Sequence, residues 1–258
     1  MLSKKNKKSL KKILIRLRIW NLIKKIQHKD VGQPLNKNLN VEGKVFYENF
    51  IAKNDLVFDV GANFGNRVAI FRAIEADVVA IEPQEKCVDY LKSTYKDLKI
   101  ENVGLGAKNE MKFFYEADNS VLSTFSNDYI EKVENTRHKT SIWKKSNQIQ
   151  IVTLDELIDK YGNPKFIKID VEGYEYEVLS GLNQKSGIIS FEYNVPELQS
   201  EVIICIEKLY TLGYDTFNYS VGETMQFHHQ HWLDYNSFKK VINENAFLKS
   251  SFGDVYVK

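Results

Sequence analysis

The sequence predicts an α/β protein with a doubly wound, Rossmann-like and mostly parallel sheet of seven strands. Short apolar runs alternate with amphipathic segments along most of the chain. A glycine-containing turn follows the first apolar run, and an acidic residue ends the second. Strands that alternate with helices in this way are joined by right-handed crossovers, which place the strands parallel to one another.

The first half of the chain contains three strands and two helices of this pattern. Residues 56–60 (LVFDV) and 78–81 (VVAI) are continuous apolar runs, as expected of buried parallel strands. Residues 66–75 and 84–95 carry apolar side chains at helical spacing. Residues 99–103 are expected to form the third strand.

The second half continues the alternation, with additional strands. The strands expected there are 112–116, 149–152, 166–170, 187–193, 214–219, 223–228 and 252–257. The helices expected there are 154–161, 174–182 and 196–212. Thr153, with Glu156 three residues later, has the spacing of a capping box at the start of the first of these helices.

Residues 118–147 interrupt the alternation. They include many Ser, Thr, Asn and charged residues and show no strand or helix pattern. A long insertion in a compact domain often carries function, so these residues are a candidate lid or substrate loop. The alternative is a surface excursion with no role in the site.

Charge divides the chain into two parts. Residues 1–30 contain eleven basic residues and one acid, a net charge of +10, whereas the rest of the 258 residues carry −8. We therefore divide the chain into a basic helical extension and linker, 1–43, and one α/β domain, 44–258. The two cysteines cannot form a disulfide scaffold or a four-thiolate zinc site, which is typical of a cytoplasmic protein.

The basic extension has several possible roles. Its apolar stretch is broken by Arg16 and Arg18 and lacks a cleavage site, so it does not resemble a signal peptide. The lysines and Trp20 of residues 4–29 suit contact with an anionic membrane surface, which would place the protein at the inner membrane face. A solvated tail, a helix that packs on a partner, and a nucleic-acid contact remain as alternatives.

The turn after the first strand indicates a nucleotide cofactor. Asp59, Gly61, Asn63 and Gly65 form a D-x-G-x-x-x-G loop, and Glu82 ends the second strand. A carboxylate at that strand end is placed to accept hydrogen bonds from both ribose hydroxyls. The extra acid in the loop would repel a pyrophosphate but suits the ammonium and sulfonium of S-adenosylmethionine. That cofactor is therefore favoured over NAD.

Five stretches resemble the FkbM-type class I methyltransferases. They are VFDVGANFGN (57–66), AIEP (80–83), NVGLG (102–106), VTLDEL (152–157) and FIKIDVEGYEYEVLSG (166–181). The resemblance covers residues 55–195. It implies the class I fold and transfer of a methyl group from S-adenosylmethionine to a hydroxyl of a sugar, polyketide or similar metabolite.

The resemblance also assigns residues to the cofactor site. It places Asp59, Gly61, Asn63, Gly65 and Glu82 at S-adenosylmethionine. It further implies that Asn102 and Val103 lie near the adenine. Arg67 departs from the family, in which an apolar, aromatic or small hydroxyl residue is common at this position.

Acidic residues at later strand ends are candidates for catalysis. Asp170 and Glu172 follow the fourth parallel strand and face the transferred methyl group, so either could be the general base for a hydroxyl acceptor. Lys168 alternates with Asp170 on one face and could hold its carboxylate ionised. Alternatively, Asp170 contacts the cofactor and Glu172 caps a helix. Glu192, at the end of the fifth strand, is a candidate for the acceptor wall.

A histidine cluster precedes an aromatic residue near the end of the sequence. His229, His231 and Trp232 are candidates for contact with a saccharide or small-molecule acceptor. We assign no metal ligands, since Asp234 is only a guess for the acid that a histidine metal site would need. A divalent cation therefore remains possible but is not expected.

Three functions compete. The leading prediction is an O-methyltransferase for a sugar, polysaccharide or glycolipid. A nucleic-acid methyltransferase is disfavoured, because D-V-E-G at 170–173 replaces the N/D-P-P-aromatic motif of base amino-group methylation. A non-catalytic scaffold at the membrane is the third possibility.

Overall fold

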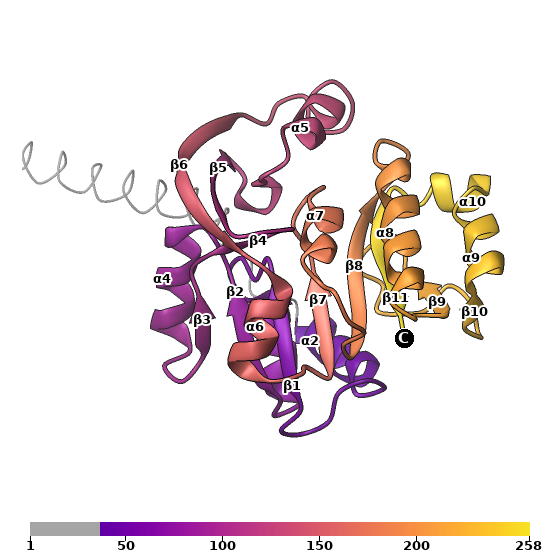
Figure 1. Ribbon diagram of the computed structural model, residues 1–258, viewed down its shortest axis with the longest axis horizontal. Helices are drawn as coiled ribbons and strands as arrows, with labels where there is room; N and C mark the ends of the chain where they lie inside the picture. Colours follow the sequence, from indigo (N-terminus) through magenta and orange to yellow (C-terminus); the bar gives the residue numbers. More distant parts are fainter. Residues whose placement is uncertain (1–36) are drawn as a thin grey trace, which may run out of the picture.

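A computed structural model describes residues 37–258 of the protein and shows one large twisted sheet with helices on both faces (Figure 1). In this part of the chain the main sheet has eight strands, in the order β10-β9-β11-β8-β7-β1-β2-β3. These strands are β1 (Leu56–Val60), β2 (Asp77–Ile81), β3 (Lys99–Glu101), β7 (Phe166–Ile169), β8 (Ile188–Asn194), β9 (Thr216–Tyr219), β10 (Leu233–Asp234) and β11 (Phe252–Val257).

The doubly wound, mostly parallel fold is confirmed. Strands β3, β2, β1, β7 and β8 pair in parallel, and β11 inserts antiparallel between β8 and β9. The predicted number of seven strands is wrong by one, because the two-residue strand β10 adds to the edge beside β9. The predicted strand at 223–228 is also wrong, since that stretch is a loop of turns between β9 and β10.

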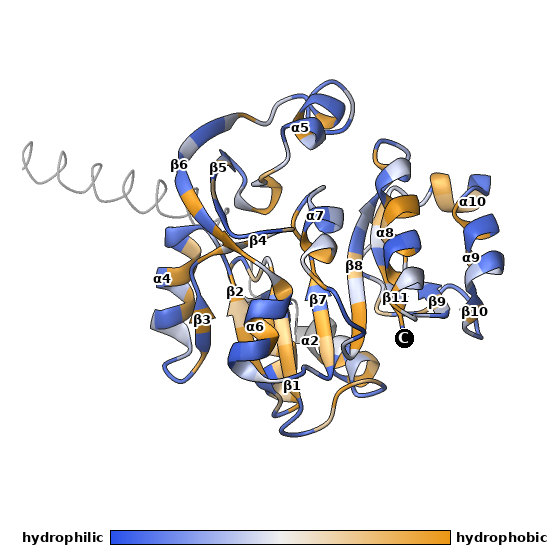
Figure 2. Ribbon diagram, viewed as in Figure 1, coloured by the Kyte–Doolittle hydropathy of each residue, from blue (hydrophilic) through white to orange (hydrophobic). Residues whose placement is uncertain are grey.

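The helices cover the two faces in separate groups. Their bounds are α2 (Lys37–Tyr47), α3 (Asn66–Ala73), α4 (Glu85–Thr94), α5 (Asn127–Val133), α6 (Leu154–Tyr161), α7 (Glu175–Ser180), α8 (Gln199–Thr211), α9 (Tyr235–Val241) and α10 (Asn245–Leu248). Apolar residues of α2 and α3 share one core with Val57 and Phe166. Apolar residues of α6, α7 and α8 pack on the opposite face, and the central strands between the two groups are strongly apolar (Figure 2).

The start of α6 matches the sequence only in part. The Thr153 hydroxyl accepts a hydrogen bond from the backbone N–H of Glu156 at 3.2 Å, as a capping box requires. The Glu156 side chain does not complete the box, because it accepts a hydrogen bond from Asn109 at 2.7 Å instead.

A second, smaller sheet replaces part of the predicted alternation. Strand β6 (Trp143–Val152) lies between β4 (Gly104–Leu105) and β5 (Glu110–Ala117). The 118–147 insertion comprises the 3₁₀ turn η1 (Ser120–Leu122), α5 and the first residues of β6, and it extends above the carboxyl ends of the main strands (Figure 1).

The amino-terminal part of the domain also differs from expectation. Residues 37–43, expected as a linker, form the first part of α2. The Tyr47 ring of this helix is fully buried and packs edge-on against Phe71 and Phe166. The basic segment 4–29 and its predicted membrane contact lie outside the described residues. No helix in the described part is long and apolar enough to span a membrane.

Candidate functional site: a pocket at the carboxyl ends of the strands

A pocket of about 520 Å³ opens where β1, β2, β7 and β8 end. Its walls contain eight of the predicted site residues: Asp59, Gly61, Asn63, Glu82, Val103, Asp170, Glu172 and Glu192. Residues 120–123, together with Phe125, Arg137 and His138, add a roof from the insertion. The strand ends thus bring together residues from four separate stretches of sequence.

The glycine loop is held tightly against the end of β7. Gly61 has a φ of +82°, and a Cβ atom at this position would lie 1.8 Å from the backbone oxygen of Asp170. Only glycine satisfies both conditions. Gly65 also has a φ of +82°, but its missing Cβ makes room for Leu91, at 2.6 Å. Gly65 therefore shapes the start of α3 rather than the pocket wall.

Glu82 is fixed by the backbone of two loops. One carboxylate oxygen accepts a hydrogen bond from the Asn63 N–H at 2.7 Å, and the other accepts one from the Gln84 N–H at 2.8 Å. Burial raises the pKa of Glu82 to about 7, although these backbone hydrogen bonds lower it. The carboxylate is therefore immobile, and its remaining lone pairs can accept further hydrogen bonds.

Asn102 supports this loop from behind. Its side-chain amide donates to the backbone oxygens of Glu82 at 3.0 Å and Pro83 at 3.1 Å. Among the described residues, Val103 lines the pocket and Asn102 does not. The predicted contact of Asn102 with the adenine therefore has no support from its position.

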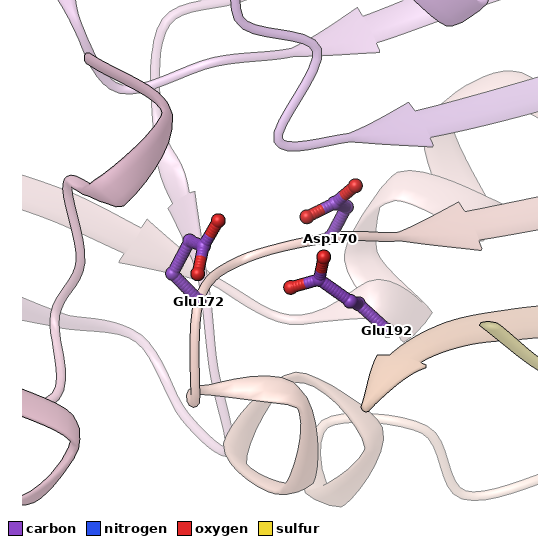
Figure 3. Close-up of side chains that lie close together, drawn as sticks. All are labelled: Asp170, Glu172 and Glu192. Carbon is purple, nitrogen blue, oxygen red and sulfur yellow. The ribbon is translucent and has the colours of Figure 1, made fainter. Parts of the chain in front are cut away.

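Three carboxylates from two strand ends face a common space (Figure 3). One ligand atom from each of Asp170, Glu172 and Glu192 can be chosen so that all three atoms lie within 4.8 Å of one another. We call this set the carboxylate cluster. Such spacing suits carboxyl groups that share protons, and it also suits the oxygen ligands of a divalent cation.

Crowding within the carboxylate cluster disfavours full ionisation. Burial and the neighbouring charge of Asp170 together raise the pKa of Glu172 to about 8. Burial, with the charges of Asp170 and Glu172, also raises the pKa of Glu192 well above its usual value. Glu172 adopts a left-handed backbone with a φ of 55°, a conformation that is uncommon and strained for glutamate.

Comparison with known proteins identifies the family. The model of the methyltransferase FkbM domain matches residues 59–244, which include most of the pocket-lining residues and most of the strands of the main sheet. The chain belongs to the FkbM methyltransferase family. The resemblance seen in the sequence, and the class I fold that it implied, are thereby confirmed.

One curated relative of this FkbM domain is the hexuronic acid methyltransferase AglP of Haloferax volcanii, which is 28% identical over 141 residues. The match covers 54% of each chain, so this FkbM protein spans about half the length of the curated relative. Among solved structures, a TehB-like SAM-dependent methyltransferase from Corynebacterium glutamicum matches with 9% identity and a TM-score of 0.44, covering 93% of this chain and 98% of its own. A SAM dependent methyltransferase from Archaeoglobus fulgidus matches with 10% identity and a TM-score of 0.42, covering 90% of this chain and 96% of its own.

Lys168 of the FkbM domain lies beneath the pocket, not in its wall. Its side chain is fully buried, and its ammonium contacts Asp170 at 3.1 Å and Asp254 at 2.8 Å. Burial alone would lower the pKa of Lys168, but these two carboxylates raise it well above the usual value. The predicted contact with Asp170 is therefore present. The contact with Asp254 was not predicted, because it depends on the insertion of β11 between β8 and β9.

The roof of the FkbM pocket supplies further residues that the sequence did not indicate. The Tyr129 hydroxyl donates to a Glu172 carboxylate oxygen at 2.6 Å. The Arg137 guanidinium donates to the Asn194 side-chain oxygen at 2.8 Å and to the Val195 backbone oxygen at 2.7 Å, and it pairs with Glu197. These contacts fasten the insertion to the ends of β7 and β8.

The histidine cluster of the FkbM domain lies elsewhere. Within the described part of the chain, His229, His231 and Trp232 are not among the residues that line the pocket. The Trp232 indole packs against Phe227 and Phe50, and the Asn218 side chain donates to the backbone oxygen of His229 at 2.8 Å. The structure therefore gives no support to their predicted contact with the acceptor.

Proposed function

We propose that this protein is an S-adenosylmethionine-dependent O-methyltransferase whose acceptor is a sugar, polysaccharide or glycolipid. The observation that carries the proposal is the carboxylate cluster beside the glycine loop. The backbone oxygen of Asp170 is in contact distance of Gly61, so the candidate base and the candidate cofactor loop form one surface.

The residues of the loop side suit the cofactor. Asp59 is buried, and its Oδ2 atom has no hydrogen-bond partner among the described residues, which leaves an acceptor for a cationic group of a ligand. Glu82 is fixed at the end of β2, where it can accept hydrogen bonds from ribose hydroxyls. When bound, S-adenosylmethionine supplies an electrophilic methyl group.

The carboxylate cluster suits removal of the acceptor proton. A sugar hydroxyl is a weak nucleophile and gains from a base within hydrogen-bond reach. A carboxylate whose pKa lies near 8, such as Glu172, is a stronger base than an ordinary glutamate, and its neighbours can share the proton that it takes. The roof and the strand ends hold the acceptor oxygen in position, and positioning contributes much of the rate of a bimolecular transfer.

The acceptor class rests on the AglP relationship and on the pocket. AglP is named for a hexuronic acid, which supports a sugar acceptor here. A methyl group placed on a hydroxyl forms an ether that resists alkali, whereas one placed on a uronic acid carboxylate forms an ester that alkali removes. The cluster of candidate bases favours the ether product.

Calorimetric titration of the full chain tests the cofactor. S-adenosylmethionine and S-adenosylhomocysteine should bind with micromolar affinity and NAD should not. Glu82→Gln should weaken binding at least tenfold, because the amide offers only one acceptor oxygen. Glu85→Gln, an exposed residue of α4, should bind like the wild type. Failure of both adenosyl ligands to bind would overturn the proposal and favour a non-catalytic scaffold.

An acceptor screen then tests the reaction. Transfer of a labelled methyl group to sugars and uronic acids should give an alkali-stable product. Asp170→Asn, Glu172→Gln and Glu192→Gln should each lower kcat by about 10²-fold or more, whereas Asp159→Asn on the exposed side of α6 should not. A parallel assay with a chelator, followed by added Mg²⁺, distinguishes shared protons from a cation in the cluster. An alkali-labile product would show that a carboxylate is the acceptor.

A further inference from the structure

A buried side chain, Gln84, joins the roof of the pocket to the end of β2. The residue before a helix often caps it, and Gln84 precedes α4, yet its side chain makes no capping bond. Its amide instead donates to the backbone oxygen of Ser120 at 3.1 Å and accepts a hydrogen bond from the Ser123 hydroxyl at 3.2 Å. Gln84 is only 5% exposed, so it holds both ends of η1 from inside the protein.

Asn63, in the glycine loop, makes a parallel link. Its side-chain oxygen accepts a hydrogen bond from the Ser120 hydroxyl at 3.3 Å. The backbone N–H groups of Asn63 and Gln84 are also the two that hold the Glu82 carboxylate. The same two residues therefore hold the candidate ribose acceptor by their main chain and the roof by their side chains.

The other end of this roof segment is attached to the carboxylate cluster. The Thr124 hydroxyl donates to the backbone oxygen of Glu172 at 2.8 Å, directly after the residues that Gln84 holds. Residues 120–123 between the two attachments line the pocket. Because this segment is short, its position over the pocket depends on both attachments.

We propose that Gln84 is a positioning residue that couples occupation of the cofactor side of the pocket to closure of the roof, an inference that rests on the proposed function. Glu82, once it accepts hydrogen bonds from ribose hydroxyls, fixes the two loops through the N–H groups of Asn63 and Gln84. The Gln84 amide then fixes the two serines of the roof above the acceptor space. Two ligands that favour the same conformation strengthen each other's binding, so the acceptor should bind more tightly to the loaded protein.

Amide hydrogen exchange of the full chain tests this coupling without turnover. Saturating S-adenosylhomocysteine should slow exchange in residues 118–126 of the wild type by about tenfold or more, because a fixed roof opens less often. Gln84→Met keeps the N–H that holds Glu82 and removes both amide contacts with the roof. This variant should bind S-adenosylhomocysteine within about threefold of the wild type, but the bound ligand should slow exchange in the roof less than about twofold.

Two further variants control the experiment. Gln148→Met makes the same substitution at an exposed position of β6 and should keep the full protection. Ser123→Ala removes one of the two contacts from the roof side and should lose part of the protection. Combined with Gln84→Met, it should cause no further loss, because both act on one contact. Exchange in β1 and β7 checks that each variant is folded, and Ser123→Ala decides the test if Gln84→Met is not.

Steady-state kinetics separate positioning from general damage. With an acceptor found by the labelled-methyl screen, Gln84→Met should raise the KM for the acceptor by about tenfold and change kcat less than about threefold. Loss of kcat with an unchanged KM would contradict the proposed coupling.

The outcomes also separate this inference from the proposed function. If the wild type binds no adenosyl ligand, both are overturned. If S-adenosylhomocysteine binds but leaves exchange in residues 118–126 unchanged, the cofactor assignment survives and the coupling is wrong. If Gln84→Met keeps the full protection, other contacts carry the coupling and the role of Gln84 is overturned. The same holds if Gln84→Met weakens S-adenosylhomocysteine by about tenfold or more, because Gln84 would then serve cofactor binding itself.

Discussion

The Tyr129 hydroxyl donates a hydrogen bond of 2.6 Å to the carboxylate of Glu172, 43 residues further along the chain. Thr124 makes a second link of the same kind, since its hydroxyl donates to the backbone oxygen of Glu172 at 2.8 Å. Tyr129 is fully buried. The roof of the pocket and a member of the carboxylate cluster therefore form one connected unit.

Removal of the Tyr129 hydroxyl should make Glu172 a worse base at neutral pH. The hydrogen bond from Tyr129 lowers a Glu172 pKa that burial and Asp170 raise to about 8, so Tyr129→Phe should raise it further. The acidic limb of the kcat profile should move up by about one pH unit, which is a tenfold loss on that limb. Tyr210→Phe, at an exposed position of α8, is the control. An unchanged pH profile of kcat would show that Glu172 is not the base that takes the acceptor proton.

Neutralising Asp254 should destabilise the protein strongly. Lys168 is fully buried, and Asp254 is one of its two carboxylate partners. Breaking a buried ion pair by removing one partner costs about 3 to 5 kcal/mol. Urea unfolding of Asp254→Asn should show a loss of this order. Glu207→Gln, in the exposed pair with Lys239, should cost less than about 1 kcal/mol.

A double variant checks the assignment of that cost. Lys168→Met combined with Asp254→Asn removes both charges, so the two single losses should add to more than the loss in the double variant. Strict additivity would mean that the two side chains act independently.

The ligand-free protein should become less stable as pH rises. Burial raises the pKa values of Asp59, Glu82 and Glu175 to about 7 and that of Glu172 to about 8. Between the ordinary carboxyl values and these raised values, the folded state holds more protons than the unfolded state. The free energy of unfolding must then fall as pH increases.

Chemical denaturation without cofactor should show this fall between about pH 5 and about pH 8 at constant ionic strength. One pKa unit corresponds to about 1.4 kcal/mol, and we expect the total loss to exceed that value. Glu172→Gln should give a shallower slope, since one of the four groups no longer titrates. Stability that rises over this interval would show that the four carboxyls are already ionised and paired in the folded state.

Arg137 should control how firmly the roof is closed. Its guanidinium joins the segment after α5 to Asn194, and Asn194 in turn donates to the Glu192 carboxylate at 3.0 Å. Arg137→Gln should increase amide hydrogen exchange in residues 126–138 by at least tenfold and raise the KM for the acceptor more than the Kd for the cofactor. Lys139→Gln, at an exposed neighbouring position, should leave both unchanged. Equal amide hydrogen exchange in the two variants would show that contacts other than those of Arg137 hold the roof closed.

Local patterns carry much of the cofactor side of the pocket. The apolar run before Asp59, the glycine at 61 and the acid at 82 each have a signal within a few residues, and the strand alternation brings them to one edge. The carboxylates after β7 and β8 follow from the same rule, because the carboxyl ends of parallel strands meet at one side of a sheet.

Contacts that depend on long-range pairing have no such signal. Asp254 reaches Lys168 only because β11 inserts between β8 and β9. The local spacing of apolar residues does not predict a strand order of this kind. The alternation along the strand did predict the contact of Lys168 with Asp170, but it gave no signal for the second acid, Asp254. Tyr129 and Arg137 lie in a polar insertion without regular spacing. The histidines near residue 229 were candidates only because they lie close together in the sequence, and such clustering does not predict whether they line the pocket.

The position of β11 also sets an order of events during synthesis. This strand follows all the other described strands along the chain, yet it occupies an interior place in the sheet, beside β8. A growing chain contains Lys168 and Asp170 before Asp254 has been made, so the charged floor beneath the pocket is incomplete until β11 takes its place between β8 and β9. The same strand therefore completes both the floor and the continuous sheet.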